Sequence, residues 1–163
     1  MISGKEPMRK AGKILVVDDD AKNRDLLQDI VVSLGHVTES AVDGESALEC
    51  LGKSSIDLVL LDILMPGLSG HEVLARMKAD ELLRSIPVVV VSAVDDMTSV
   101  LQAIEAGAED YLVKPIDSRL LKARMSACLE KKRLRDREEE LHQELVASYA
   151  RLREATRARD ALT

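Results

Sequence analysis

Five short runs rich in aliphatic residues alternate along the chain with longer segments whose apolar residues recur at helical spacing. The runs are ILVV (14–17), HVTESAV (36–42), DLVLLD (57–62), PVVVVSA (87–93) and DYLVKP (110–115). The continuously apolar runs are typical of strands buried on both faces, whereas HVTESAV alternates like an edge strand. Helical spacing predicts helices near 21–34, 43–52, 69–83 and 95–108, three of them closed by Gly35, Gly52 and Gly107. Strands that alternate with helices predict a doubly wound α/β fold with a five-stranded parallel sheet.

The C-terminal part of the chain has a different pattern. Residues 118–163 contain neither Gly nor Pro and are dominated by Leu, Ala, Arg and Glu, which predicts one long helix. Its apolar stripe consists of Leu134, Leu141, Leu145, Leu152 and Leu162. This spacing predicts a coiled coil that pairs two chains as a parallel homodimer, modestly because Ser148, Ala155 and Arg159 interrupt the seam. The expected segments are an N-terminal extension (1–12), one domain (13–130) and a coiled-coil linker helix (131–163).

Charge and composition narrow the classes of function. The net charge is −6, the pI is about 5.2, and the excess acidity lies in residues 1–128. A nucleic-acid-binding surface needs clustered basic residues, so we expect no nucleic-acid partner. No apolar stretch is long enough to span a membrane, and we therefore expect a cytoplasmic protein without membrane contact. Cys50 and Cys128 stand alone in helix-like segments, and we expect buried small apolar residues in a reducing compartment rather than a disulfide.

Acidic residues follow two of the expected strands. Asp18, Asp19 and Asp20 come directly after the first strand, and Asp62 ends the third. Close carboxylates repel one another by about 1 kcal/mol or more per pair, so the cluster requires either full solvation or a bound cation. Parallel α/β sheets bind ligands at the carboxyl ends of their strands, and carboxylate oxygens suit Mg²⁺ or Mn²⁺. The pattern favours a divalent-metal site over a merely solvated acidic turn.

Two further strand ends carry complementary groups. The fourth strand ends in Ser92, and the fifth ends in Lys114 followed by Pro115. A carboxylate nucleophile, a metal ion, a hydroxyl and an ammonium are together the parts that phosphoryl transfer requires. The sequence therefore predicts a site at which a carboxylate attacks phosphorus while the hydroxyl and the ammonium bind the remaining phosphoryl oxygens.

These motifs, in this order and spacing, resemble the receiver domain of two-component response regulators over about residues 13–130. The matching stretches are ILVVDDD, DLVLLDILMPGLSG, PVVVVSA and GAEDYLVKPI. The resemblance implies a flavodoxin-like sheet of strand order 2-1-3-4-5, which brings the first and third strands together. It also implies a histidine kinase or a phosphotransfer protein as the partner that donates the phosphoryl group.

The same resemblance assigns roles to the acidic residues. Asp62 is the expected phosphoacceptor, and Asp18 and Asp19 are the acid pair expected to bind Mg²⁺ with it. The backbone carbonyl of Leu64 is the expected further metal ligand. Leu64 stands where the family often carries a polar residue, which leaves the lifetime of the phosphorylated state open. Asp20 either caps the following helix or touches the metal, and the cap is the favoured reading.

The resemblance also assigns the remaining strand ends. Ser92 and Lys114 are expected to bind the phosphoryl group. Tyr111, three residues before Lys114, matches the aromatic switch position, whose ring turns inward when Ser92 moves. Phosphorylation at this site would thereby change the surface around the fourth and fifth strands.

Two hypotheses remain for how the chain passes on its signal. The first is the input half of a larger regulator, in which the helix relays the signal to a kinase, cyclase or phosphatase module beyond Thr163. The alternative is a complete stand-alone adaptor whose coiled coil binds a partner protein. An enzyme of the haloacid-phosphatase type is disfavoured because Leu64 occupies the place of its second aspartate. His142 lacks the neighbours of a phosphoaccepting histidine box and is expected to lie on a solvated helix face.

Overall fold

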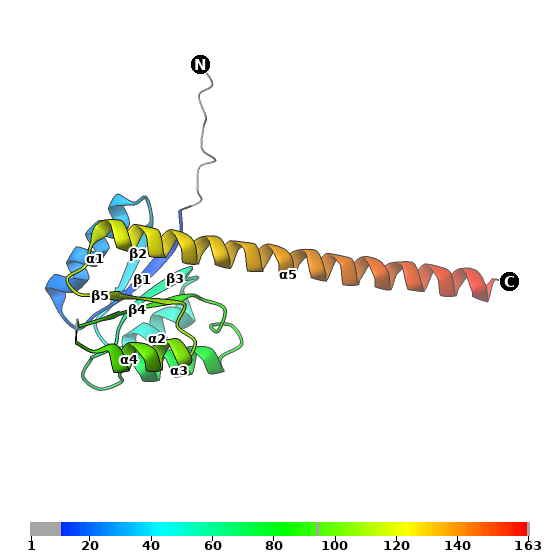
Figure 1. Cartoon of the computed structure of the whole chain (residues 1–163). Coiled ribbons are helices and arrows are strands. Elements are labelled where there is room, and N and C mark those ends of the chain that lie inside the picture. Colours follow the sequence, from blue (N-terminus) through cyan, green and yellow to red (C-terminus); the bar gives the residue numbers. More distant parts are fainter. Residues whose placement is uncertain (1–10, 94, 163) are drawn as a thin grey trace, which may run out of the picture. The chain divides into compact units, whose positions relative to one another are not determined.

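The computed structural model describes residues 11–93 and 95–162 and contains a five-stranded parallel sheet (Figure 1). The strands are β1 (Lys13–Val17), β2 (Val37–Ala41), β3 (Leu58–Asp62), β4 (Val88–Ser92) and β5 (Asp110–Val113). Their order is β2-β1-β3-β4-β5, and every adjacent pair is parallel. This order confirms the doubly wound, flavodoxin-like fold, and it places the carboxyl ends of β1 and β3 side by side.

Helices connect the strands and cover both faces of the sheet. They are α1 (Ala21–Ser33), α2 (Gly44–Lys53), α3 (Gly70–Ala79), α4 (Met97–Glu105) and α5 (Ser118–Ala161). α2, α3 and α4 pack on one face, and α1 and the first turns of α5 pack on the other. The chain divides into two compact units after Leu129, so the first turns of α5 belong to the sheet domain.

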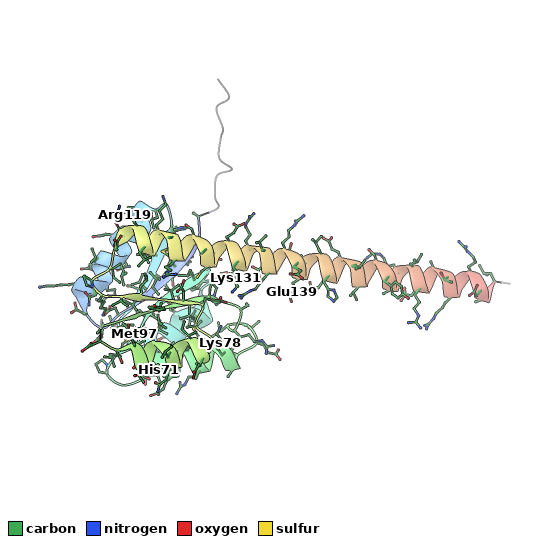
Figure 2. The ribbon with its side chains drawn as sticks, in the orientation of Figure 1. His71, Lys78, Met97, Arg119, Lys131 and Glu139 are labelled. Atoms are coloured by element: carbon green, nitrogen blue, oxygen red, sulfur yellow. The ribbon has the colours of Figure 1, made fainter. Side chains whose placement is uncertain are left out.

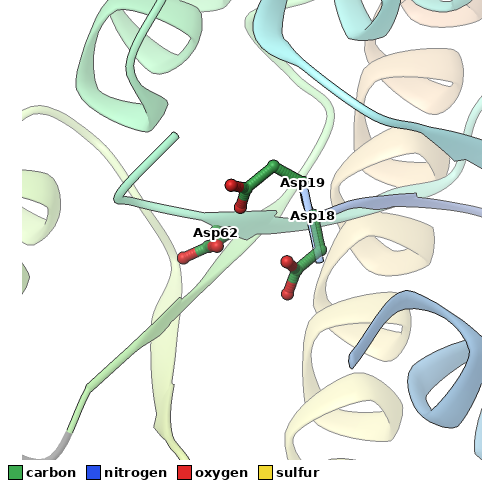
Figure 3. A group of neighbouring side chains, drawn as sticks. All are labelled: Asp18, Asp19 and Asp62. Carbon is green, nitrogen blue, oxygen red and sulfur yellow. The ribbon is translucent and has the colours of Figure 1, made fainter. Parts of the chain in front are cut away.

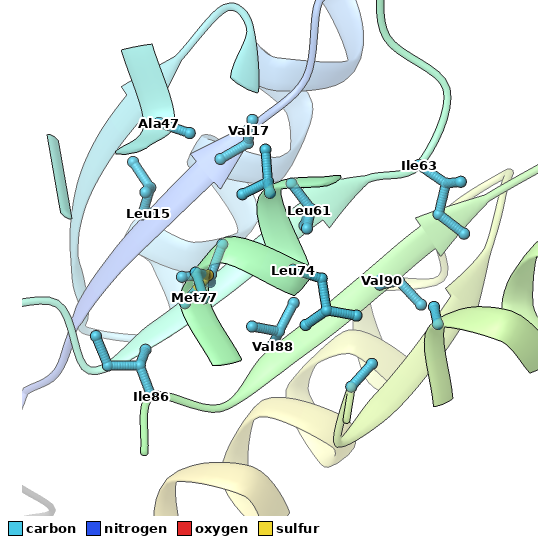
Figure 4. Close-up of a cluster of buried hydrophobic side chains, with 14 of the residues drawn as sticks. Leu15, Val17, Ala47, Leu61, Ile63, Leu74, Met77, Ile86, Val88 and Val90 are labelled. Atoms are coloured by element: carbon cyan, nitrogen blue, oxygen red, sulfur yellow. The ribbon is translucent and has the colours of Figure 1, made fainter. Parts of the chain in front are cut away.

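The three central strands are buried on both faces. Toward α2, α3 and α4 they present Leu15, Val17, Val59, Leu61, Val88 and Val90 (Figure 4). Toward α1 and α5 they present Ile14, Val16, Leu58, Leu60, Val89 and Val91. None of these side chains is more than 1% exposed. Because both faces need apolar side chains, the central strands read as continuous apolar runs rather than as alternating ones.

Two helix ends differ from those expected. α3 was expected to reach residue 83, but it ends at Ala79. The Asp80 carboxylate accepts the Leu82 N–H at 2.8 Å, and this local turn competes with a further helical turn. α2 continues through Gly52, which has no positive φ, whereas Gly35 and Gly107 have φ of 91° and 111°. Only those two glycines therefore end helices in the left-handed conformation.

The second unit begins at Glu130, and within it the remainder of α5 runs to Ala161. Its leucines are exposed, with values of 58% for Leu134, 68% for Leu145 and 65% for Leu152. Charged side chains such as Lys131 and Glu139 surround the helix (Figure 2). Ion pairs one turn apart, such as Lys132–Asp136 at 2.8 Å, support the helix locally.

Among the described residues, no helix is both long enough and apolar enough to cross a bilayer.

Candidate functional site

Three carboxylates meet at the carboxyl end of the sheet (Figure 3). Asp18 and Asp19 follow β1, and Asp62 is the last residue of the adjacent strand β3. One carboxylate oxygen of each lies within 4.8 Å of the others. Asp18 is fully buried and Asp62 is 6% exposed, whereas Asp19 lies at the surface. The side chains expected to share a metal are therefore brought together, with one open side.

The Asp18 side chain is oriented by a hydrogen bond to one carboxylate oxygen and by an ammonium beside the other. Its Oδ1 accepts the backbone N–H of Asp20 at 2.9 Å. Its Oδ2 is buried, accepts no hydrogen bond and lies 3.4 Å from the Lys114 ammonium. A buried carboxylate oxygen without a hydrogen bond is costly unless a cation lies beside it. This oxygen is consequently well suited to bind a metal ion.

Lys114 supplies the positive charge at the site. Its Nζ lies 3.4 Å from Asp18 Oδ2 and 3.5 Å from Asp62 Oδ2, so one ammonium serves both buried carboxylates. The Lys114 backbone N–H donates to the carbonyl of Ser92 at 2.8 Å, which ties the ends of β4 and β5 together. The ammonium is thereby fixed over the acidic cluster.

The charge on Asp62 is poorly compensated. Burial, followed by the nearby charge of Asp18, raises the pKa of Asp62 to about 6, although Lys114 and the Leu64 N–H lower it. Without a divalent cation this carboxylate is therefore partly protonated near pH 6. Oxygen ligands from three carboxylates, one of them with a buried oxygen that accepts no hydrogen bond, fit Mg²⁺ or Mn²⁺.

The neighbours of the trio have distinguishable roles. Asp20 Oδ1 accepts the N–H groups of Lys22 at 2.8 Å and Asn23 at 3.3 Å, so the observed role of Asp20 is to cap α1. Leu64 lies two residues past Asp62 with a side chain that is 64% exposed. Metal binding by its carbonyl stays a prediction.

Ser92 and Tyr111 lie on the two strands beyond β3. Ser92 is buried at the end of β4, where its hydroxyl donates weakly to the carbonyl of Ala93 at 3.4 Å. This long bond leaves the hydroxyl available to another acceptor. Tyr111 on β5 is partly buried and packs against the core cluster formed with α2, α3 and α4. The switch roles of both residues stay predictions.

Two contributors to the site were missed by sequence reasoning. Gly70 begins α3 so close to Asp62 that a Cβ there would collide with the Asp62 carbonyl oxygen. Arg24 on α1 reaches back to the Asp18 carbonyl, with 2.8 Å between Nη1 and the oxygen. The only sequence signals are a glycine after the loop and an arginine in the first turns after the acidic cluster. Neither signal identifies its contact, because both contacts depend on tertiary packing.

Comparison with known proteins identifies a single family. The family model described as "Response regulator receiver domain" matches residues 14–126. The chain is 39% identical over 115 residues to "Response regulator PleD" of Caulobacter vibrioides, covering 71% of this chain and 25% of that protein. It is 34% identical over 125 residues to "Chemotaxis protein CheY-3" of Vibrio cholerae, covering 76% of this chain and 96% of that protein.

Solved structures give the same result. A putative response regulator from Chloroflexus aurantiacus aligns with a TM-score of 0.72 at 30% identity, covering 74% of this chain and 99% of that chain. NtrX from Brucella abortus aligns with a TM-score of 0.76 at 34% identity, covering 80% of this chain and 29% of that chain. The chain thus spans only about a quarter of the curated relative PleD and nearly all of CheY-3.

Proposed function

The chain belongs to the response regulator receiver domain family, and we propose that Asp62 accepts a phosphoryl group in a reaction that requires Mg²⁺. As a receiver domain the chain is a signalling module of two-component systems, so the partner that donates the phosphoryl group is a histidine kinase or a phosphotransfer protein. The observation that carries this proposal is the convergence of Asp18, Asp19, Asp62 and Lys114 at one edge of the sheet.

The proposed reaction is an in-line displacement at phosphorus. An oxygen of ionised Asp62 forms a bond to phosphorus while the bond from phosphorus to the donor breaks, and the donor leaves with that electron pair. Asp18, Asp19, Asp62 and the carbonyl of Leu64 would hold Mg²⁺, and the bound ion would supply positive charge that neutralises the phosphoryl oxygens. The chain performs no further chemistry than its own phosphorylation and dephosphorylation.

Lys114 and Ser92, at the ends of β5 and β4, complete the site. The Lys114 ammonium is already within 3.5 Å of Asp62 and stabilises negative charge on a transferred group. The Ser92 hydroxyl, weakly bonded at 3.4 Å, is free to turn toward a phosphoryl oxygen. We infer that this movement lets Tyr111 turn inward and so changes the surface of β4 and β5.

The direct test uses a small phosphodonor. Incubation of the intact chain with acetyl phosphate and Mg²⁺ should add one phosphoryl group, which intact-mass spectrometry detects. Removal of divalent cations with a chelator should abolish the addition, because the carboxylates then lack the charge that offsets their repulsion of the donor. An unlabelled chain in the presence of Mg²⁺, or labelling that a chelator leaves unchanged, would contradict the proposal.

We also propose that the exposed stripe of α5 pairs two chains as a parallel coiled coil. Leu134, Leu145 and Leu152 are each more than half exposed on an otherwise charged helix. Two such stripes can bury one another, with Arg and Glu flanking the seam. A seam interrupted by Ser148 and Arg159 gives a joint that can shift when the receiver is phosphorylated.

Substitution within and beside the stripe tests this pairing. Leu145→Glu should convert the dimer to a monomer in sedimentation experiments, because it puts two carboxylates opposite each other in the seam. Val146→Glu adds the same charge one residue away, at an exposed position outside the stripe, and should leave the dimer intact. A monomeric wild-type chain, or a Leu145→Glu variant that dimerises as well as wild type, would exclude the stripe as the pairing element.

The helix could pass the signal on in two ways. We favour relay to an output module of kinase, cyclase or phosphatase type, because the chain covers only 25% of PleD. The alternative is a stand-alone adaptor, and the 96% coverage of CheY-3 favours it. The mass of the native protein distinguishes the two, since only the first requires a longer polypeptide.

A further inference from the structure

The turn that joins β1 to α1 is fixed by one hydrogen bond at each of three successive peptide groups. The Asp18 N–H donates to the carbonyl of Ala41 at 3.2 Å. The Asp18 carbonyl accepts from Arg24 Nη1 at 2.8 Å. The Asp20 N–H donates to Asp18 Oδ1 at 2.9 Å. The bond from Arg24 therefore fixes the orientation of the peptide group between Asp18 and Asp19. The two carboxylates of the acid pair lie on either side of this peptide group.

Arg24 is itself placed by the same turn. Asp20 caps α1, and the Arg24 N–H donates to the Asp20 carbonyl at 3.0 Å in the first helical turn. From this half-buried position the guanidinium returns to the Asp18 carbonyl. The third aspartate thus acts on the acid pair indirectly, by fixing the helix that carries Arg24.

We propose that Arg24 is a positioning residue for the Mg²⁺ site: it orients the peptide group between Asp18 and Asp19 so that both carboxylates face Asp62. The proposal rests on the proposed function, since it concerns the metal that phosphorylation requires. A charge-assisted hydrogen bond of 2.8 Å to a carbonyl is stronger than a neutral one and restricts this peptide group to one orientation. Removal of a group that orients metal ligands typically weakens metal affinity by about 10- to 100-fold.

The charge of Arg24 makes the proposal sharply testable. As a cation near a cation site, Arg24 disfavours Mg²⁺ by direct repulsion, so its removal should tighten binding if electrostatics alone matter. As a positioning residue it favours Mg²⁺, so its removal should weaken binding. The two roles predict changes of opposite sign in the same measurement.

Arg24→Met keeps most of the apolar stem and removes the donor and the charge. Titration of Mg²⁺ against the amide NMR signals of the intact chain should show affinity weakened roughly tenfold. Lys22→Met is the matched control, because Lys22 is exposed on the same first turn and its side chain is not bonded to the Asp18 carbonyl. Lys22→Met should bind Mg²⁺ as well as wild type or slightly more tightly.

The conservative variant separates positioning from folding. Arg24→Lys keeps a cationic donor on a long stem and should recover most of the lost affinity, while urea unfolding without Mg²⁺ checks that each variant is folded. Equal or tighter Mg²⁺ binding by folded Arg24→Met would overturn the proposal, as would an Arg24→Lys variant as weak as Arg24→Met. Absence of Mg²⁺ binding by the wild-type chain would instead refute the proposed function, so the two failures are distinguishable.

Discussion

The Asp62→Asn variant should gain no phosphoryl group under conditions that label the wild-type chain. The amide keeps the shape of the side chain at a 6% exposed position, but it removes the anionic oxygen that attacks phosphorus. Intact-mass spectrometry after incubation with acetyl phosphate and Mg²⁺ measures the difference directly. Asp57→Asn, at a carboxylate outside the acidic cluster, is the matched control and should be labelled like wild type. Labelling of Asp62→Asn at the wild-type level would remove Asp62 as the acceptor.

The same variant should be more stable than wild type near pH 7 when no divalent cation is present. The folded-state pKa of Asp62 is raised to about 6, above its unfolded value of 3.8, so the folded state binds the proton more tightly. Well below pH 3.8, Asp62 is protonated in both the folded and the unfolded state, so its ionisation does not lower the free energy of unfolding. The cost of ionising Asp62 develops as the pH rises from about 4 to 6 and is complete above that range.

After allowance for solvent screening, this cost is about 1–2 kcal/mol at pH 7. Urea unfolding followed by circular dichroism should therefore show Asp62→Asn gaining stability over wild type as the pH rises from 4 to 7. Mg²⁺ should reduce the difference, because it stabilises the ionised wild-type site. A difference that is independent of pH would show that the charge of Asp62 is not the cause.

The second large effect is expected at the acid pair. Asp18→Asn and Asp19→Asn should each weaken Mg²⁺ binding by about tenfold or more and slow phosphorylation, because each removes one of few anionic ligands. Asp18→Asn also leaves the Lys114 ammonium with one carboxylate fewer, so the larger loss is expected there. Mg²⁺ titration by NMR gives the affinities, since the chain contains no Trp for fluorescence.

Asp20→Asn is the matched control for the acid pair. It removes an equal charge from the adjacent residue, but Asn is as good an N-cap as Asp, so α1 should stay in place. We expect an affinity close to that of wild type. An equal loss in all three variants would mean that Mg²⁺ responds to general negative charge, and unchanged affinity in Asp18→Asn and Asp19→Asn would exclude them as ligands.

The sheet and the acidic cluster could be predicted because each produces a recognisable local pattern in the sequence. A strand buried on both faces must be continuously apolar, and its last residues must carry the chemistry of the carboxyl edge, as ILVVDDD and DLVLLD do. No local sequence pattern shows that β1 and β3 are adjacent. Their adjacency was inferred from the family resemblance and is confirmed by the strand order.

Other features could not be predicted, because no recognisable sequence pattern shows the contacts on which they depend. The hydrogen bond from Arg24 to the Asp18 carbonyl requires both the cap by Asp20 and the packing of α1 on the sheet. The early end of α3 follows from a local bond of Asp80 that competes with a helix-forming sequence. Composition predicts the long helix after Ser118, and its leucines are exposed, so the surface that would cover them stays a prediction.

Localisation of the phosphoryl group tests the central claim most directly. After phosphorylation with acetyl phosphate and Mg²⁺, borohydride reduction converts an aspartyl phosphate to homoserine, and peptide mass spectrometry identifies the modified position. We expect homoserine at position 62 alone, and only in samples that contained Mg²⁺. Homoserine at Asp18, Asp19 or any other aspartate, or a chain without modification, would contradict the assignment of Asp62 as the phosphoacceptor.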